Sequence, residues 1–184
     1  MLHWLGVLAV GQFASVFFAN RFPHAKIFSV EPDADNFATA QKNLAPYKNV
    51  LLVKGAVWHK PQTINLVDRG HGVAAYMVEE GAGKNEIRAY TIKEIMDIMG
   101  ATGIDVLKMD VEGTEKELFE FGYEDWLPKT KVLITETHDR YKAGTSRAVF
   151  NAVGKYDFSL ELSGENLVLY NNQLVTAYPQ SGKG

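Results

Sequence analysis

Apolar runs and amphipathic runs alternate along most of the chain. Short apolar runs rich in β-branched residues are typical of buried strands, and apolar residues spaced three and four apart are typical of helices. On this pattern the predicted strands are 4–11, 26–30, 49–57, 86–90, 104–109 and 131–137, and the predicted helices are 15–22, 33–45, 91–100, 114–122 and 145–153. Strands that alternate with helices predict an α/β domain with a mostly parallel sheet.

The C-terminal part of the chain breaks this alternation. Two strand-like runs, 156–162 and 166–170, are joined by Ser163, Gly164 and Glu165. This spacing predicts a β-hairpin, which would supply an antiparallel edge to the sheet. No linker divides the chain, so we expect one domain over residues 1–184.

Two stretches in the middle of the chain give weaker signals. The run 49–57 is apolar throughout, which predicts one strand buried on both faces. Further on, Ile64 and Leu66 alternate with polar residues as in a strand, but the Gly-rich segment 69–84 follows no clear period. We therefore assign no element to that segment.

Two helix starts carry the pattern of a capping box. Thr91 is followed by Glu94, and Thr114 is followed by Glu117, each three residues later. In such a box the hydroxyl accepts a backbone N–H and the Glu side chain bonds back to the first residue. We expect Thr91 and Thr114 to cap their helices, with Glu115 favoured at the helix N-terminus by the helix dipole.

Composition excludes several classes of protein. A net charge of −3 without a basic run argues against nucleic acid as the main partner, and the absence of Cys excludes disulfides, thiolate zinc sites and a Cys nucleophile. Residues 1–19 are apolar but lack the basic start of a leader and the unbroken apolar run of a membrane span. We expect these residues to belong to the fold. For the protein we expect no membrane partner and a cytoplasmic location. Motifs of P-loop, zinc-protease and nucleophile-elbow enzymes are absent.

The first candidate for chemistry is Glu31, which follows the second predicted strand. In α/β domains that bind nucleosides, an acid in this place accepts hydrogen bonds from both ribose hydroxyls. An ordinary exposed acid at the end of a strand explains Glu31 equally well. Ala56, near the end of the third predicted strand, is small enough to let an adenine ring approach, although packing also explains a small residue there.

The second group of candidates follows the strand 104–109. Asp110 and Glu112 are two residues apart and share a face if the strand continues. Two close carboxylates can act as a general base, hold a cation or anchor a ligand amine. The alternatives are solvated acids and a structural ion pair between Lys108 and Asp110.

A third group lies at the end of the strand 131–137, where Glu136 and His138 are two residues apart. A histidine at the carboxyl end of a strand can act as a general base because its pKa lies near neutral pH. A histidine held structurally by hydrogen bonds is the alternative. We assign no residue of the chain as a metal ligand.

Taken together and in order, these pieces resemble the FkbM family of methyltransferases, from about residue 17 to about residue 170. The run from Lys108 through Asp110, Glu112 and Gly113 to Glu115 is the most specific of them. The other pieces are Ser29–Phe37, Gly55–Val57, Thr91–Ile92 and Glu136–His138.

The resemblance implies a three-layer, Rossmann-like class I methyltransferase fold with an antiparallel last strand, and S-adenosylmethionine as cofactor. It implies O-methylation of a hydroxyl on a sugar or small natural product. Carried over by position, the implied cofactor-binding residues are Gly11, Glu31, Pro32, Asp33, Asn36, Ala56, Val57 and Asp110. The implied substrate-binding residues are Glu136 and His138, and the candidate catalytic residues are Asp110, Glu112 and His138.

The chain also departs from the family pattern. The family's first strand ends in an acid and a Gly-rich loop, whereas Ala9 stands in the place of the acid and only Gly11 remains of the glycines. Lys93 stands where the family usually has Asp, and we expect the N-terminal lid segment to be missing. The alternative function is therefore a catalytically inactive or truncated methyltransferase-like domain. A nicotinamide-dependent dehydrogenase would need the Gly-rich fingerprint that the sequence lacks.

Overall fold

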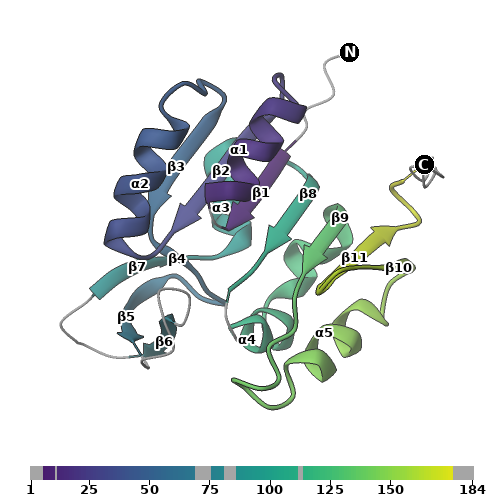
Figure 1. The fold of residues 1–184 in the computed structure, drawn as a ribbon. Helices are drawn as coiled ribbons and strands as arrows, with labels where there is room; N and C mark the ends of the chain where they lie inside the picture. The colour runs from purple at the N-terminus through teal and green to yellow at the C-terminus, as the bar shows by residue number, and fades with distance from the viewer. Residues whose placement is uncertain (1–5, 11, 69–75, 81–85, 112–113, 176–184) are drawn as a thin grey trace.

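A computed structural model describes residues 6–10, 12–68, 76–80, 86–111 and 114–175 (Figure 1). Its core is a seven-stranded sheet in the order β10-β11-β9-β8-β1-β2-β3. These strands are β1 (Gly6–Val10), β2 (Lys26–Glu31), β3 (Val50–Lys54), β8 (Ile104–Met109), β9 (Thr130–Thr135), β10 (Phe158–Ser163) and β11 (Asn166–Asn171). All neighbouring pairs are parallel except those that β11 makes with β9 and β10.

This order confirms the mostly parallel sheet and the C-terminal hairpin. The outermost strand of the hairpin is β10, so the antiparallel strand β11 lies one position in from the edge. The opposite edge is β3, where Leu51 is 50% exposed. The prediction that the run 49–57 is buried on both faces is therefore wrong, because an edge strand leaves part of its side chains uncovered.

Gly55 divides the predicted strand 49–57 in two. After β3 the chain turns into the short strand β4 (Ala56–Val57), which belongs to a second sheet. A Cβ on Gly55 would lie 2.7 Å from the carbonyl oxygen of Arg88 and 2.7 Å from the ring of Tyr90. Only glycine therefore allows β7 to pass this close to the turn.

The second sheet has four strands in the order β4-β7-β5-β6 and was not predicted. Besides β4 it contains β5 (Gln62–Asp68), β6 (Tyr76–Glu80) and β7 (Glu86–Tyr90). The strand-like signals at Ile64 and at 86–90 belong to β5 and β7, which pair in antiparallel register. Figure 1 shows this sheet beyond the carboxyl ends of β2 and β3.

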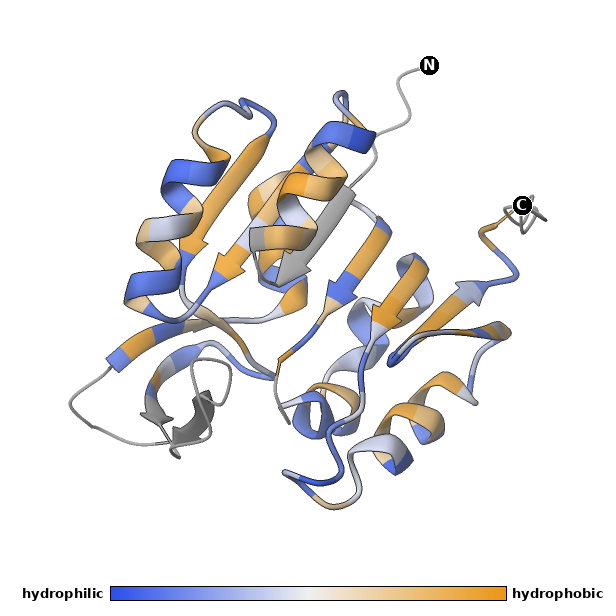
Figure 2. Cartoon of the chain, viewed as in Figure 1, coloured by the Kyte–Doolittle hydropathy of each residue, from blue (hydrophilic) through white to orange (hydrophobic). Residues whose placement is uncertain are grey.

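Helices cover both faces of the central sheet, which confirms three layers. One face carries α1 (Gln12–Arg21) and α2 (Ala34–Leu44), and the other carries α3 (Ile92–Met99), α4 (Glu115–Glu120) and α5 (Thr145–Val153). Two short 3₁₀ helices, η1 (Tyr123–Asp125) and η2 (Leu127–Lys129), follow α4. Figure 2 shows apolar residues concentrated along the central strands. No described helix has both the length and the apolar character needed to cross a bilayer.

One of the two predicted capping boxes forms a cap. The hydroxyl of Thr91 accepts the backbone N–H of Glu94 at 3.0 Å, as predicted. Thr114 is already in the helical region and caps nothing with its side chain; its hydroxyl donates to the carbonyl of Val111 at 3.0 Å. The prediction for Thr114 is wrong because a capping residue needs an extended backbone, whereas Thr114 has helical backbone angles.

Candidate active site

The carboxyl ends of β2, β1, β8 and β9 meet at one edge of the central sheet. From β1 the chain winds through α1 to β2 on one side, whereas α3 leads into β8 on the other side. Glu31 ends β2 and Asp110 directly follows β8, so the two acids flank β1 at this edge. A change in winding direction of this kind is where open α/β sheets bind their ligands. Glu31 and Asp110 therefore lie at the same edge of the sheet.

Glu31 is a buried carboxylate held by the backbone of the loop that follows it. It is 8% exposed, and its Oε1 accepts the N–H of Asp33 at 3.1 Å. Burial raises the pKa of Glu31 above its usual 4.5, and the hydrogen bonds from Asp33 and Asn36 offset this only in part. A carboxylate in this state gains from further hydroxyl donors, which is what the vicinal hydroxyls of a ribose offer.

The loop around Glu31 is fixed by the start of α2. The carboxylate of Asp33 caps this helix by accepting the N–H groups of Asp35 and Asn36 at 3.0 and 2.9 Å. Pro32 and Asn36 are half-buried beside it. The predicted nucleoside-binding residues of this loop therefore form one locally bonded unit.

The other predicted cofactor residues have different surroundings. The side chain of Val57 packs in the main core, and that of Ala56 packs in a small cluster with Trp58, Ile64 and Ala89. Both side chains are buried within the protein. Gly11 and Glu112 lie outside the described residues, as does Gly113.

A second group of side chains, here called the carboxylate–histidine cluster, gathers at the ends of β8 and β9. It consists of Lys108, Asp110, Glu115, Glu136 and His138. Nδ1 of His138 lies 2.7 Å from Oε1 of Glu115, and both residues are buried. Because a carboxylate oxygen can only accept, Nδ1 donates and carries the proton. In the neutral ring, Nε2 therefore presents its lone pair.

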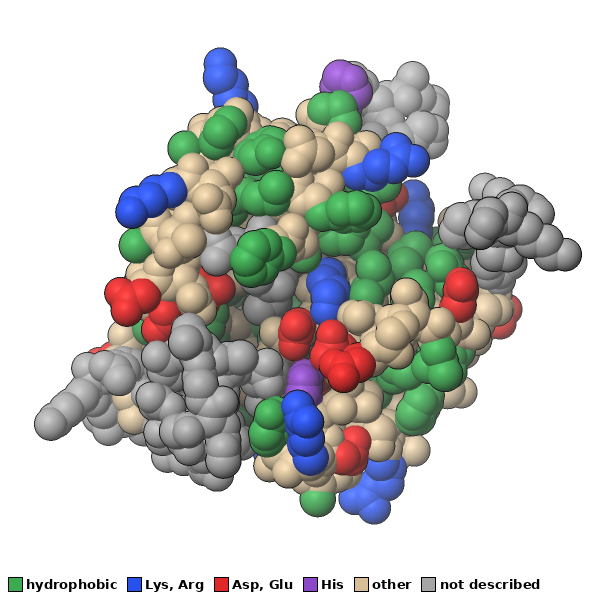
Figure 3. All heavy atoms as spheres, viewed as in Figure 1, with side chains coloured by type: hydrophobic (Ala, Val, Ile, Leu, Met, Phe, Trp, Pro, Cys, Tyr) green, Lys and Arg blue, Asp and Glu red, His purple; other side chains and the backbone are tan. Residues whose placement is uncertain are grey.

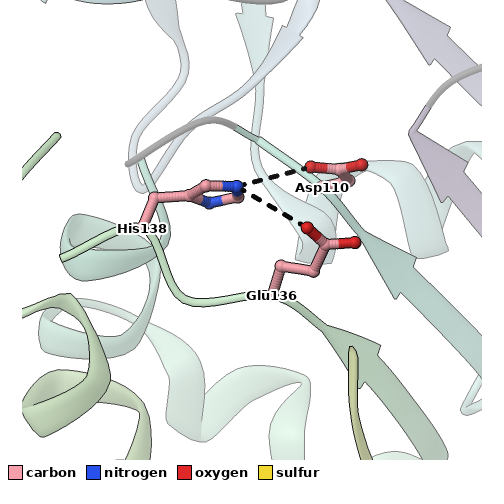
Figure 4. Close-up of side chains that lie close together, drawn as sticks. All are labelled: Asp110, Glu136 and His138. Atoms are coloured by element: carbon pink, nitrogen blue, oxygen red, sulfur yellow. Dashed lines mark ion pairs between the residues drawn. The ribbon is translucent and has the colours of Figure 1, made fainter. Parts of the chain in front are cut away.

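Nε2 of His138 points toward two further carboxylates (Figure 4). It lies 3.9 Å from Oδ1 of Asp110 and 3.8 Å from Oε2 of Glu136. One possible ligand atom from each of these three residues lies within 4.8 Å of the other two, so together they could hold a metal ion. Figure 3 shows acidic, basic and histidine side chains gathered near the centre of this face of the molecule.

Lys108 lies on the opposite side of the same two carboxylates. Its Nζ is 3.8 Å from Oδ2 of Asp110 and 3.7 Å from Oε1 of Glu136. The predicted pair of Lys108 and Asp110 is confirmed, and it extends to Glu136. One oxygen of each carboxylate thus faces the ammonium group and another faces the imidazole. This arrangement can accept a proton, bind a cation or hold a hydroxylated ligand.

The role of Glu115 was missed in the sequence. Its place at the start of a helix suggested an exposed acid, whereas its side chain is 0% exposed and anchors His138. The two residues lie 23 positions apart and meet only because β8 and β9 are neighbours in the sheet. The ring of Tyr141 stacks on the imidazole ring of His138, with ring centroids 5.9 Å apart.

Comparisons with known proteins agree with this architecture. The family model described as "Methyltransferase FkbM domain" matches residues 8–160. A precorrin-6y C5,15-methyltransferase from Geobacter metallireducens superimposes with a TM-score of 0.51 at 11% identity, over 92% of this chain and 80% of that one. A putative caffeoyl-CoA O-methyltransferase from Staphylococcus aureus superimposes with a TM-score of 0.52 at 13% identity, over 90% of this chain and 74% of that one. At these identities the likeness shows the fold alone. No curated protein matches this chain.

Proposed function

The chain belongs to the FkbM methyltransferase family, with S-adenosylmethionine as cofactor, and we propose that it methylates a hydroxyl of a small acceptor such as a sugar or natural product. The observation that carries this proposal is the placement of two polar centres at one sheet edge. Glu31 lies on one side of β1, and the carboxylate–histidine cluster lies on the other.

The residues at the Glu31 side fit the nucleoside part of the cofactor. Glu31 would accept hydrogen bonds from the ribose hydroxyls, because burial has removed water from its carboxylate. Pro32, Asp33 and Asn36 would shape the loop around the ribose. We also assign Gly11, Ala56, Val57 and Asp110 to this cofactor site, with the buried Ala56 and Val57 contributing backbone rather than side chains.

The carboxylate–histidine cluster fits the substrate that accepts the methyl group. When bound, S-adenosylmethionine supplies an electrophilic methyl group, and the acceptor oxygen must lose its proton as it attacks that group. Nε2 of His138 and the carboxylates of Asp110 and Glu136 converge where such a hydroxyl can be held and its proton accepted. We assign Glu112 to the same catalytic group. Most of the rate gain would come from holding both reactants in line.

Calorimetric titration of the full chain with S-adenosylmethionine tests the first half of this proposal. We expect saturable binding at cofactor concentrations below about 1 mM, within the usual range for enzyme substrates. The second half is tested by transfer of a labelled methyl group to a panel of sugars and phenolic or hydroxylated natural products. No heat of binding, or binding without transfer to any hydroxyl, would contradict the proposal.

A second candidate is a methyltransferase-like domain without catalysis. The first-strand loop favours it, because Ala9 replaces the acid that the family places there and only one of the family's glycines remains. Absence of cofactor binding in the titration would support this candidate. A cytoplasmic location and the absence of a nucleic-acid partner stay predictions from the sequence.

A further inference from the structure

We propose that Asp110, Glu136 and His138 bind a divalent first-row metal ion at the acceptor side of the site. Glu115 would orient the histidine ligand, and Lys108 would contact the oxygen of each carboxylate that does not face the ion. Binding of the ion does not depend on the proposed methyl transfer; only its role in catalysis does.

The spacing of the donor atoms suits such an ion. Nε2 of His138 lies 3.9 Å from Oδ1 of Asp110 and 3.8 Å from Oε2 of Glu136. Donors that bind an ion at about 2.2 Å, with angles of about 90–120° between them, lie about 3.1–3.8 Å apart. One observed distance is at the upper end of this range and the other is 0.1 Å beyond it, and both are too long for direct hydrogen bonds.

The protonation of His138 provides the second argument. Its Nδ1–H donates to the buried carboxylate of Glu115, so the lone pair of Nε2 faces two carboxylate oxygens. Three electron-rich atoms that converge in this way repel one another, and either a bound cation or a proton on Nε2 relieves that repulsion. A histidine that donates its far N–H to a carboxylate is the usual arrangement of a histidine bound to a metal ion.

An unsatisfied oxygen points to the same place. Oδ1 of Asp110, the atom that faces His138, is buried and has no hydrogen-bond partner within the described part of the chain. A buried acceptor without a partner is costly, and such atoms in native proteins commonly mark an ion or water that is part of the site. The Asp110 side chain as a whole is 38% exposed, which leaves an ion a path from solvent.

The charge of the cluster also favours a divalent ion. Asp110, Glu115 and Glu136 carry three negative charges, and Lys108 carries one positive charge, which leaves −2 when His138 is neutral. A second proton on His138 would neutralise only one of these charges. Lys108 contacts Oδ2 and Oε1, so it leaves Oδ1 and Oε2 available to the ion.

The ion would contribute to the proposed function by binding the acceptor hydroxyl. Three protein donors leave coordination positions open, as in catalytic rather than structural metal sites. A hydroxyl bound there would be more acidic and would lose its proton to water, in place of transfer to Nε2 of His138, whose lone pair the ion would then occupy. This step rests on the proposed methyl transfer.

Electron paramagnetic resonance of Mn²⁺ tests the site without any assay of activity. Free Mn²⁺ gives a strong signal that falls on binding, so titration of the full chain counts the sites and gives their affinity. We expect one site per chain, at least 10-fold weaker in Asp110→Asn and in His138→Gln. Glu115→Gln should weaken it 10–100-fold, as is usual for a carboxylate that orients a histidine ligand.

Two further variants separate the site from general damage to the fold. Glu117→Gln removes an acid two residues from Glu115 that pairs with Lys142 instead, and should leave Mn²⁺ affinity unchanged. Lys108→Gln removes the ammonium group that competes with the ion, and should tighten binding, which a misfolded protein could not do. Undiminished free Mn²⁺ with the wild-type chain, or equal binding by Asp110→Asn and wild type, would overturn the inference. Cofactor titration without metal keeps the two proposals apart, since either can fail while the other stands.

Discussion

The two sides of the proposed site are built in different ways. On the nucleoside side, Glu31 is held by the backbone of Asp33, which in turn caps α2, so the contacts span only two or three residues. On the acceptor side, the bond between Glu115 and His138 joins residues 23 positions apart. The nucleoside side is therefore encoded by local sequence, whereas the acceptor side exists only once β8 and β9 lie next to each other.

The two sides also differ in how their charges are balanced. Burial raises the pKa of Glu31, which means that the folded protein holds its carboxylate at a cost until a donor arrives. The carboxylates of Asp110 and Glu136 instead share the ammonium group of Lys108. We infer that the nucleoside side depends on its ligand for stabilisation, whereas the acceptor side is partly stabilised by the protein itself.

The largest effect on the stability of the fold is expected from breaking the acceptor side at Glu115. Glu115→Ala leaves the buried Nδ1–H of His138 without its acceptor, which should lower the free energy of unfolding by about 1–3 kcal/mol. Methyl transfer should fall as well, because the imidazole is no longer held in place. Urea unfolding and the transfer assay measure the two effects. Glu117→Ala is the matched control on the same helix, and an equal loss of stability there would contradict the assigned role of Glu115.

At the nucleoside side, Glu31→Gln should change binding and stability in opposite directions. Loss of the charged acceptor should weaken S-adenosylmethionine binding by about 1.5–3 kcal/mol, or one to two orders of magnitude in Kd. The variant without cofactor should unfold at a higher temperature at neutral pH, because a buried charge is gone. Calorimetric titration and thermal unfolding test this pair of effects. Asp35→Asn, at an exposed position in the first turn of α2, should change neither.

The stability gain of Glu31→Gln should also depend on pH. Because the pKa of Glu31 is raised in the folded state, folding favours its protonated form, and the cost of the buried carboxylate is present above that raised pKa. The cost disappears as the pH falls toward 4.5, the usual value of the group. Unfolding free energies of wild type and variant should therefore converge between neutral pH and pH 4.5. A difference that stays constant over this range would show that Glu31 titrates normally.

The same contrast explains which features could be predicted from the sequence. Strands, helices, the cap at Thr91 and the place of Glu31 depend on neighbours in the sequence, and the structure bears them out. The second sheet could not be predicted, because it depends on pairing between β5, β6 and β7 and on the close approach at Gly55. The cap at Thr114 failed because this residue has helical backbone angles and its hydroxyl bonds back to the carbonyl of Val111.

The acceptor side shows most clearly where prediction from the sequence ends. The sequence pattern placed Asp110, Glu136 and His138 at the ends of predicted strands. Because the carboxyl ends of parallel strands share an edge, these residues come together there. The orientation of His138 could not be foreseen, since it is set by Glu115 on a different element. A sequence pattern can thus place residues at an edge, but it does not say which of them will bond to each other.

The smallest expected effect comes from removing helix caps. It tests whether the cap beside Glu31 matters for cofactor binding or only for the stability of its helix. Asp33 and Thr91 both cap a helix with a side-chain oxygen, on α2 and α3 respectively. Replacing either with Ala should lower the free energy of unfolding by about 1 kcal/mol, the usual value of a cap. Only Asp33→Ala should also weaken S-adenosylmethionine binding, because the N–H of residue 33 positions the carboxylate of Glu31 and depends on the capped turn. If both variants bound the cofactor equally well, the loop would not need its cap to hold Glu31, and the nucleoside side would be less locally determined than its hydrogen bonds indicate.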